Sequence, residues 1–170
     1  MNLTRRNWVA QAAALAASIF GGTAFAAGRS VKVSLWDTGA MALHTDGQGP
    51  MMGMAMGAAG QRLPMAHMGI KLSAHTVAAG LVSFNVRNDS KVLAHEMVVS
   101  RIKNAKTPLP FKEAENKVDE DAAAALGEVA ELEPGKSGAL KLTLKRGQYI
   151  LYCNVVGHYA HGMWTILTVT

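Results

Sequence analysis

The sequence predicts an all-β fold, a Greek-key β-sandwich or barrel with one short helical excursion. Short runs of alternating apolar and polar residues recur along the chain, and turn-forming residues separate them; this pattern is typical of such folds. The 170 residues suffice for one domain of this kind. The predicted strands cover residues 31–36, 70–74, 82–86, 92–100, 139–144, 149–153 and 164–169.

Period-two patterns and the turns between them justify the individual strands. Residues 31–36 (Val-Lys-Val-Ser-Leu-Trp) alternate as a half-buried strand should, and the apolar residues of 82–86 recur at every second position. Residues 87–90 (Arg-Asn-Asp-Ser) and 133–136 (Glu-Pro-Gly-Lys) are turn sequences, because Asn, Asp, Pro and Gly favour turn conformations. We therefore expect the chain to reverse direction at these two places.

The helical excursion is predicted over Asn116–Leu126. Residues 119–121 are all acidic and would lie in the first turn of the helix, where the helix dipole favours negative charge. The alanines that follow have high helix propensity, and Gly127 would end the helix.

The N-terminus has the pattern of a signal peptide over residues 1–26. Arg5 and Arg6 form a charged region, residues 9–20 are apolar and rich in alanine, and residues 24–26 read Ala-Phe-Ala, a cleavage pattern. The apolar run is too short to span a bilayer comfortably. The arginine pair is compatible with a twin-arginine signal or with an ordinary secretory one. Either predicts export, and we expect a periplasmic protein with no stable membrane span after cleavage.

The remaining chain divides by composition. Residues 27–68 contain an N-terminal strand followed by a flexible segment rich in Met, Gly and Ala, and residues 69–170 supply the remainder of the domain. The formal net charge is +5, without a cluster of Lys and Arg. Nucleic acid is therefore not a predicted partner.

Cys153 is the only cysteine of the chain. Exported proteins usually use cysteines in pairs, as disulfides. A lone cysteine is instead an inert core residue, an intermolecular bridge or a metal ligand.

The neighbours of Cys153 favour the metal. The motif Cys153-x4-His158-x4-Met163 lies between two predicted strands, and His95 lies upstream in another strand. A trigonal set of two His and one Cys with a weak axial Met describes a type 1 copper centre.

This motif resembles the C-terminal motif of the cupredoxins, and its spacing is similar to that of rusticyanin-like members. The resemblance covers roughly residues 69–170 and is most specific in the last twenty. It implies one type 1 copper ion with His95, Cys153, His158 and Met163 as ligands. The chain as a whole also resembles periplasmic copper-tolerance cupredoxins.

Two residues near the motif depart from the family pattern. Glu96 follows the first histidine, where the family commonly has a small polar residue that helps to lock the cysteine loop. Its carboxylate could bond the backbone near Asn154, form an ion pair or face solvent. His161 lies in the loop but outside the register of the motif, so we expect it to be exposed.

A second group of soft ligands lies in the Met-rich segment. Seven of the ten methionines fall between positions 41 and 68, together with two histidines. Their Gly and Ala neighbours make packed core an unfavoured interpretation. Thioethers select Cu(I), so we favour weak Cu(I) capture over adaptable apolar filler. The candidate accessory ligands are Met41, His44, Met51, Met52, Met54, Met56, Met65, His67 and Met68.

The favoured function is copper tolerance or homeostasis, in which the protein binds copper or passes it to a periplasmic copper-handling partner. The alternative is a small electron carrier that meets a redox partner. In that case His158 would be a partly exposed ligand through which electrons leave, and residues 155, 156, 159 and 160 would form an apolar docking patch.

We do not predict an enzyme. Multicopper oxidases and copper nitrite reductases need further copper sites and further domains, and in them histidines commonly flank the cysteine. Here Tyr152 and Asn154 flank Cys153.

Overall fold

The alternation along β1 (Arg29–Asp37) sets one face of the protein. A computed structural model describes residues 29–39 and 67–170. In β1 the side chains of Val31, Val33 and Leu35 are buried, whereas Lys32 between them is exposed. Successive side chains of a strand point to opposite faces, so this pattern directs one face of β1 into the core.

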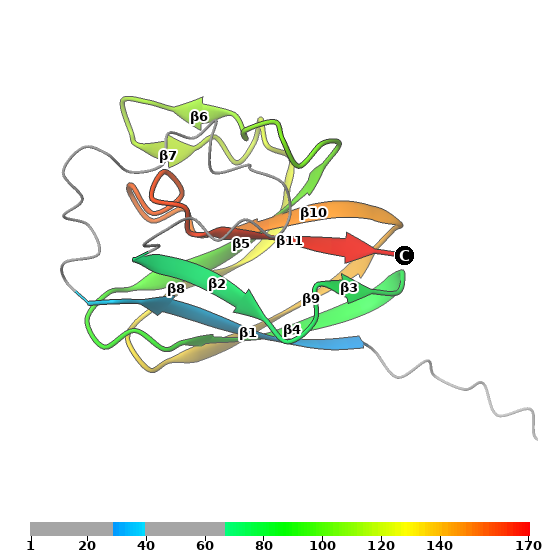
Figure 1. The fold of residues 1–170 in the computed structure, drawn as a ribbon, viewed down its shortest axis with the longest axis horizontal. Helices are drawn as coiled ribbons and strands as arrows, with labels where there is room; N and C mark the ends of the chain where they lie inside the picture. The colour runs from blue at the N-terminus through cyan, green and yellow to red at the C-terminus, as the bar shows by residue number, and fades with distance from the viewer. Residues whose placement is uncertain (1–28, 40–66) are drawn as a thin grey trace, which may run out of the picture.

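Two sheets form a β-sandwich (Figure 1), which confirms the predicted all-β class. Strand β1 pairs in parallel with β4 and β3 pairs in parallel with β11, while the other strand pairs are antiparallel. One sheet has the order β2 (Met68–Leu72), β1, β4 (Gly80–Asn88), β9 (Ser137–Leu144). The other has the order β3 (Thr76–Val77), β11 (Trp164–Val169), β10 (Gly147–Tyr152), β5 (His95–Ile102), β8 (Ala125–Leu132). A separate pair joins β6 (Phe111–Lys112) and β7 (Lys117–Val118).

The five-stranded sheet is buried on both faces in its middle. Its inner face packs with the four-stranded sheet in the main core, to which Met97 and Leu151 contribute. Its outer face packs beneath the β6–β7 region, where Val98, Ile150 and Tyr152 form a second cluster. For this reason every residue of 95–100 is buried, although the run includes His, Glu and Ser.

The predicted helix over Asn116–Leu126 is wrong. Residues 117–118 form β7, one turn follows, and β8 begins at Ala125. The side chain of Asn154 holds both backbone polar groups of Val118, accepting from its N–H at 2.7 Å and donating to its C=O at 3.0 Å. These bonds keep the segment extended where a helix would need the same groups. Gly127, the expected helix end, lies inside β8.

The end of this turn shows why no helix continues from it. The N–H of Ala123 donates to the Asp119 carbonyl at 2.8 Å, which is one helical turn. Ala124 then has a φ of 49°, and this left-handed conformation stops a right-handed helix. Within the described residues there is no α-helix. None of their segments is a helix with the length and apolar character that crossing a bilayer requires.

The predicted strands agree with the observed ones to within a few residues, but the short strands β3, β6 and β7 and the longer β8 are absent from the prediction. The strand predicted over 92–100 begins at His95, because residues 89–94 form a loop. The pattern of β8 is weak, since Val129 is its only buried residue and acidic side chains interrupt the alternation.

Candidate metal centre

The loop before β5 places His95 at the first position of that strand. The Asn88 amide donates to the carbonyls of Leu93 at 2.9 Å and Leu132 at 2.7 Å. Its side-chain oxygen accepts from the N–H of Ser90, and the Ser90 hydroxyl oxygen accepts from the N–H of Leu93 at 2.8 Å. Asn and Ser commonly organise turns in this way. The loop therefore has a fixed shape where His95 enters the sandwich.

The loop between β10 and β11 carries the other candidate ligands and lies beside β6 and β7 (Figure 1). The N–H of Cys153 donates to the carbonyl of Met163 at 3.0 Å, so the two ends of the motif lie side by side. The N–H of His158 donates to the Val155 carbonyl at 2.9 Å, and the Met163 N–H donates to the His158 carbonyl at 3.0 Å. The tight turns require positive φ at Gly157 (81°) and Gly162 (85°), which glycine adopts without strain.

Three donor atoms from these two loops converge. The Nδ1 atoms of His95 and His158 are 3.2 Å apart, and the Cys153 Sγ is 3.3 Å from His158 Nδ1 and 4.0 Å from His95 Nδ1. Among the described residues this is the group of His, Cys, Asp and Glu side chains that could hold a metal ion, and all three are buried.

These distances fit a trigonal metal site. Imidazole and thiolate bonds to a first-row ion are about 2.0–2.3 Å long, so three such donors around one ion lie roughly 3.5–3.8 Å apart. The observed separations of 3.2, 3.3 and 4.0 Å straddle that range. The residues therefore fit one copper ion with shifts of a few tenths of an ångström.

Met163 is fully buried and packs in the same cluster as Cys153. Its backbone bond to Cys153 keeps it at the site end of the loop. A thioether there can serve as the weak fourth ligand of a type 1 centre.

Backbone N–H groups surround the sulfur. The N–H of Glu96 donates to the Cys153 Sγ at 3.4 Å, and the N–H of Val155 also bonds it. Burial nevertheless raises the pKa of the Cys153 thiol to about 12. Since the thiolate is the form that binds metals, this site needs a cation to stabilise the negative sulfur.

Both imidazoles are neutral at neutral pH. Burial, together with the neighbouring His95 and His161, lowers the pKa of His158 to about 4. Burial also lowers the pKa of His95, although the hydrogen bond from its ring to Asp37 opposes this shift. Neutral imidazole is the metal-binding form, so both rings are ready to bind without losing a proton.

Sequence reasoning missed Asp37, which contacts His95 directly. The Asp37 Oδ2 lies 2.7 Å from His95 Nε2, and the two side chains are 1% and 0% exposed. One signal could have found it: Asp37 continues the odd-numbered register of Val31, Val33 and Leu35, which is the buried face of β1. A carboxylate on that face needs a partner.

Among the described residues, Glu96 shows none of the three expected arrangements, which were a bond to the backbone near Asn154, an ion pair and exposure to solvent. Its side chain is buried, and within the described part of the chain its Oε1 has no hydrogen-bond partner. Burial raises the pKa of this carboxyl to about 7, against the opposing charge of Lys117. The Asn154 side chain bonds Val118 and the Glu120 carboxylate instead.

The other histidines that the structure describes lie outside the cluster. His161 is partly buried and not exposed as expected, and its Nδ1–H donates to the Gly157 carbonyl at 2.7 Å. His158 is only 2% exposed, so it is not the partly exposed ligand of the electron-carrier alternative. In the expected docking patch, Val156 is 59% exposed whereas Tyr159 is buried.

Two members of the Met-rich group lie within the described residues. Met68 is fully buried in the main core, where it is the first residue of β2 and pairs with Asp37. His67 is partly buried, with its Nδ1 3.4 Å from the Thr38 hydroxyl. Outside the described residues lie Met41, His44, Met51, Met52, Met54, Met56 and Met65.

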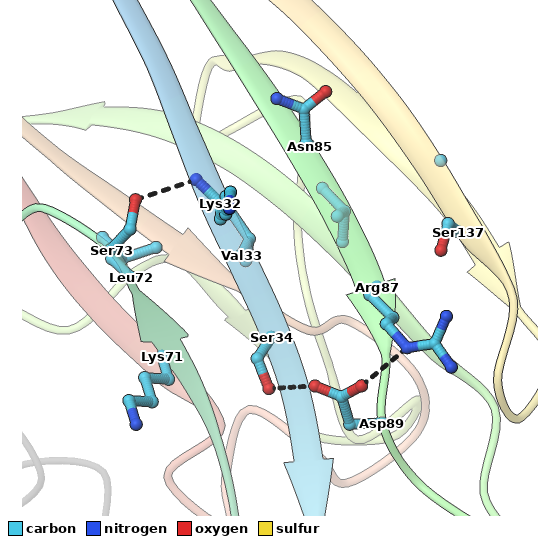
Figure 2. A pocket seen from close by; sticks show the side chains of 12 residues that line it. Lys32, Val33, Ser34, Lys71, Leu72, Ser73, Asn85, Arg87, Asp89 and Ser137 are labelled. Atoms are coloured by element: carbon cyan, nitrogen blue, oxygen red, sulfur yellow. Dashed lines mark hydrogen bonds and ion pairs between the residues drawn. The ribbon is translucent and has the colours of Figure 1, made fainter.

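A pocket of about 680 Å³ lies on the outer face of the four-stranded sheet, and it contains none of these donors. Figure 2 shows its polar lining, in which Asp89 accepts from Ser34 and, at 2.9 Å, from Arg87. These bonds occupy the carboxylate that lines the pocket.

Comparison with known proteins finds a likeness among solved structures. No protein-family model and no curated protein matches the chain. Among solved structures, rusticyanin from Thiobacillus ferrooxidans is 15% identical, with 84% of this chain and 79% of that chain covered and a TM-score of 0.50. Reduced auracyanin from Roseiflexus castenholzii is 17% identical, with coverage of 83% and 96% and a TM-score of 0.46.

At such identity the likeness to rusticyanin shows the fold alone: this chain has the cupredoxin fold. Two buried imidazoles and one thiolate, with a buried methionine on the same loop, fit one type 1 copper ion. Fold and donor set together support a type 1 copper site.

Proposed function

We propose that His95 Nδ1, His158 Nδ1 and Cys153 Sγ hold one copper ion, with Met163 as the weak axial ligand, and that the protein transfers single electrons through it. The convergence of three buried donors at 3.2–4.0 Å carries this proposal. Sites of this kind hold Cu(II) and Cu(I) in nearly one geometry. A preformed cluster therefore suits electron transfer, because little has to rearrange when the electron arrives.

The loop that holds His158 also offers the shortest route to a partner. Val156, two residues before His158, is 59% exposed, while His158 itself is 2% exposed. A partner that docks on this loop would come close to a ligand of the copper. The periplasm is the proposed location, with residues 1–26 as signal peptide and residues 27–68 and 69–170 as the two parts of the exported chain.

Visible spectroscopy of the copper-loaded protein tests the ligand set. We expect intense thiolate-to-copper absorption that disappears on reduction and returns on oxidation. Cys153→Ser should abolish it, whereas His161→Gln, which changes a histidine of the same loop outside the cluster, should retain it. Retention of the intense absorption in Cys153→Ser would exclude the cysteine as ligand.

Copper tolerance is a second candidate, supported by the methionines and histidines between positions 41 and 68. Because Met68 belongs to the core, the test is a deletion of residues 41–66. The Thr38 N–H donates to the His67 carbonyl at 2.8 Å, so the two ends already meet and a short hairpin connection can replace the segment.

Cells that lack the protein would then receive either the wild type or the deletion. If the segment serves tolerance, the deletion should retain its visible colour and fail to restore growth in copper. Full rescue by the deletion variant would remove the segment from this role.

A further inference from the structure

The carboxylate of Asp37 joins the two sheets at the metal centre. Asp37 is the last residue of β1 in the four-stranded sheet, and His95 is the first residue of β5 in the five-stranded sheet. Their side chains meet at 2.7 Å through Oδ2 and Nε2, and both are almost completely shielded from solvent. The imidazole thus has the donor cluster on one side and a buried carboxylate on the other.

The groups around Asp37 all donate to it. The Gly39 N–H donates to Oδ1 at 2.6 Å, and the Ser90 side chain also bonds the carboxylate. The Ser90 oxygen already accepts from the N–H groups of Val92 and Leu93, so its own hydrogen is free for Asp37.

A carboxylate that accepts from Nε2 determines the tautomer of His95. A neutral imidazole carries one proton, and the bond to Asp37 keeps that proton on Nε2. The lone pair of Nδ1 then points to the cluster, where Nδ1 lies 3.2 Å from its counterpart on His158. Among the described residues, His158 forms no ion pair with a carboxylate, so the two ligand imidazoles differ in their electrostatic surroundings.

We propose that Asp37 is a positioning residue that selects Nδ1 of His95 as the ligand atom and whose negative charge favours Cu(II) over Cu(I) at this site. The inference rests on the proposed copper function. A fixed negative charge one imidazole away stabilises the more positive ion, and in a buried site solvent screens it little. The strong acceptor also makes the imidazole a better electron donor.

Asp37→Asn removes the charge and keeps an acceptor for Nε2–H. Partners of metal-bound histidines typically contribute 10–100-fold to metal affinity. We therefore expect the affinity for Cu(II) to fall about 10–100-fold relative to that for Cu(I). This corresponds to a rise in reduction potential of roughly 60–120 mV, since tenfold equals about 59 mV for one electron.

Two further variants separate charge from other effects. Asp37→Glu keeps the charge, and its potential should stay closer to the wild-type value than that of Asp37→Asn. Asp89→Asn removes the same charge from an aspartate whose side chain is 41% exposed and pairs with Arg87. Solvent screening should make its shift small. Equal shifts for Asp37→Asn and Asp89→Asn, or no shift for Asp37→Asn, would overturn the role of the charge.

The tautomer is tested without copper. In the metal-free wild-type chain, nitrogen NMR of the His95 ring should show a protonated Nε2 and an unprotonated Nδ1, and Asp37→Ala should give a mixture. A wild-type ring protonated on Nδ1 would refute the positioning role. If the protein bound no copper at all, the proposed function would fail while this measurement still decided the tautomer.

Discussion

Glu96→Gln should make the metal-free protein more stable at pH 8 and leave its stability near pH 4 almost unchanged. The folded protein keeps a proton on Glu96 up to about pH 7, because the side chain is buried and Oε1 has no hydrogen-bond partner among the described residues. The reference value for the carboxyl is 4.5. Between these two pH values unfolding releases a proton, so this group lowers the free energy of unfolding as the pH rises.

The size of the effect follows from the shift. One pKa unit corresponds to 1.36 kcal/mol, so a shift from 4.5 to about 7 makes the ionised Glu96 cost about 3 kcal/mol at pH 8 relative to pH 4. The two imidazoles act in the opposite direction: burial lowers the pKa of His158 to about 4, and His95 is also lowered. The stability that the two neutral imidazoles contribute is lost as the pH falls. In the wild type this partly hides the dependence of the unfolding free energy on pH that is due to Glu96.

Urea denaturation of wild type and Glu96→Gln from pH 4 to pH 8 isolates the effect. The difference in unfolding free energy should grow by about 3 kcal/mol over this range, and any constant cost of burying the glutamine amide cancels. Glu128→Gln, an exposed glutamate on the adjacent strand β8, is the matched control and should show little change. Parallel wild-type and Glu96→Gln curves would refute the reasoning.

Two further predictions concern the surroundings of the site. Asn154→Ala removes the two hydrogen bonds to the backbone of Val118, so it should lower the unfolding free energy by about 2–4 kcal/mol. Urea denaturation of this variant and of the exposed control Asn104→Ala checks the prediction. An equal loss of stability in both variants would contradict it. Met68→Ala should lower the unfolding free energy by about 2–5 kcal/mol and leave the copper absorption intact, because Met68 is fully buried in the core. Unchanged stability together with a reduced Cu(I) stoichiometry would instead make Met68 an accessory ligand.

Much of the architecture could be predicted because it depends on local patterns. The alternation of residues 31–36 and 82–86 predicts β1 and β4, and the observed register pairs these strands in parallel. The spacing from Cys153 to Met163 predicts a ligand loop, and the structure brings Cys153 and His158 together with His95.

Other features depend on contacts between distant segments. The partnership of Asp37 with His95 arises only when β1 and β5 meet across the sandwich. The acidic and alanine-rich run over 116–126 has good helix propensity, yet Asn154 in the next loop holds its start extended. Tertiary bonds of this kind override local propensity. Glu96 follows the same logic, since its burial comes from the β6–β7 region that covers the outer face of β5.

Electron paramagnetic resonance of the fully oxidised, copper-loaded protein tests the central claim most directly. We predict one Cu(II) per chain, with the narrow hyperfine splitting that a covalent copper–thiolate bond produces and that disappears in Cys153→Ser. A wide splitting typical of tetragonal copper with nitrogen and oxygen ligands, unchanged by Cys153→Ser, would contradict a type 1 centre at His95, Cys153 and His158.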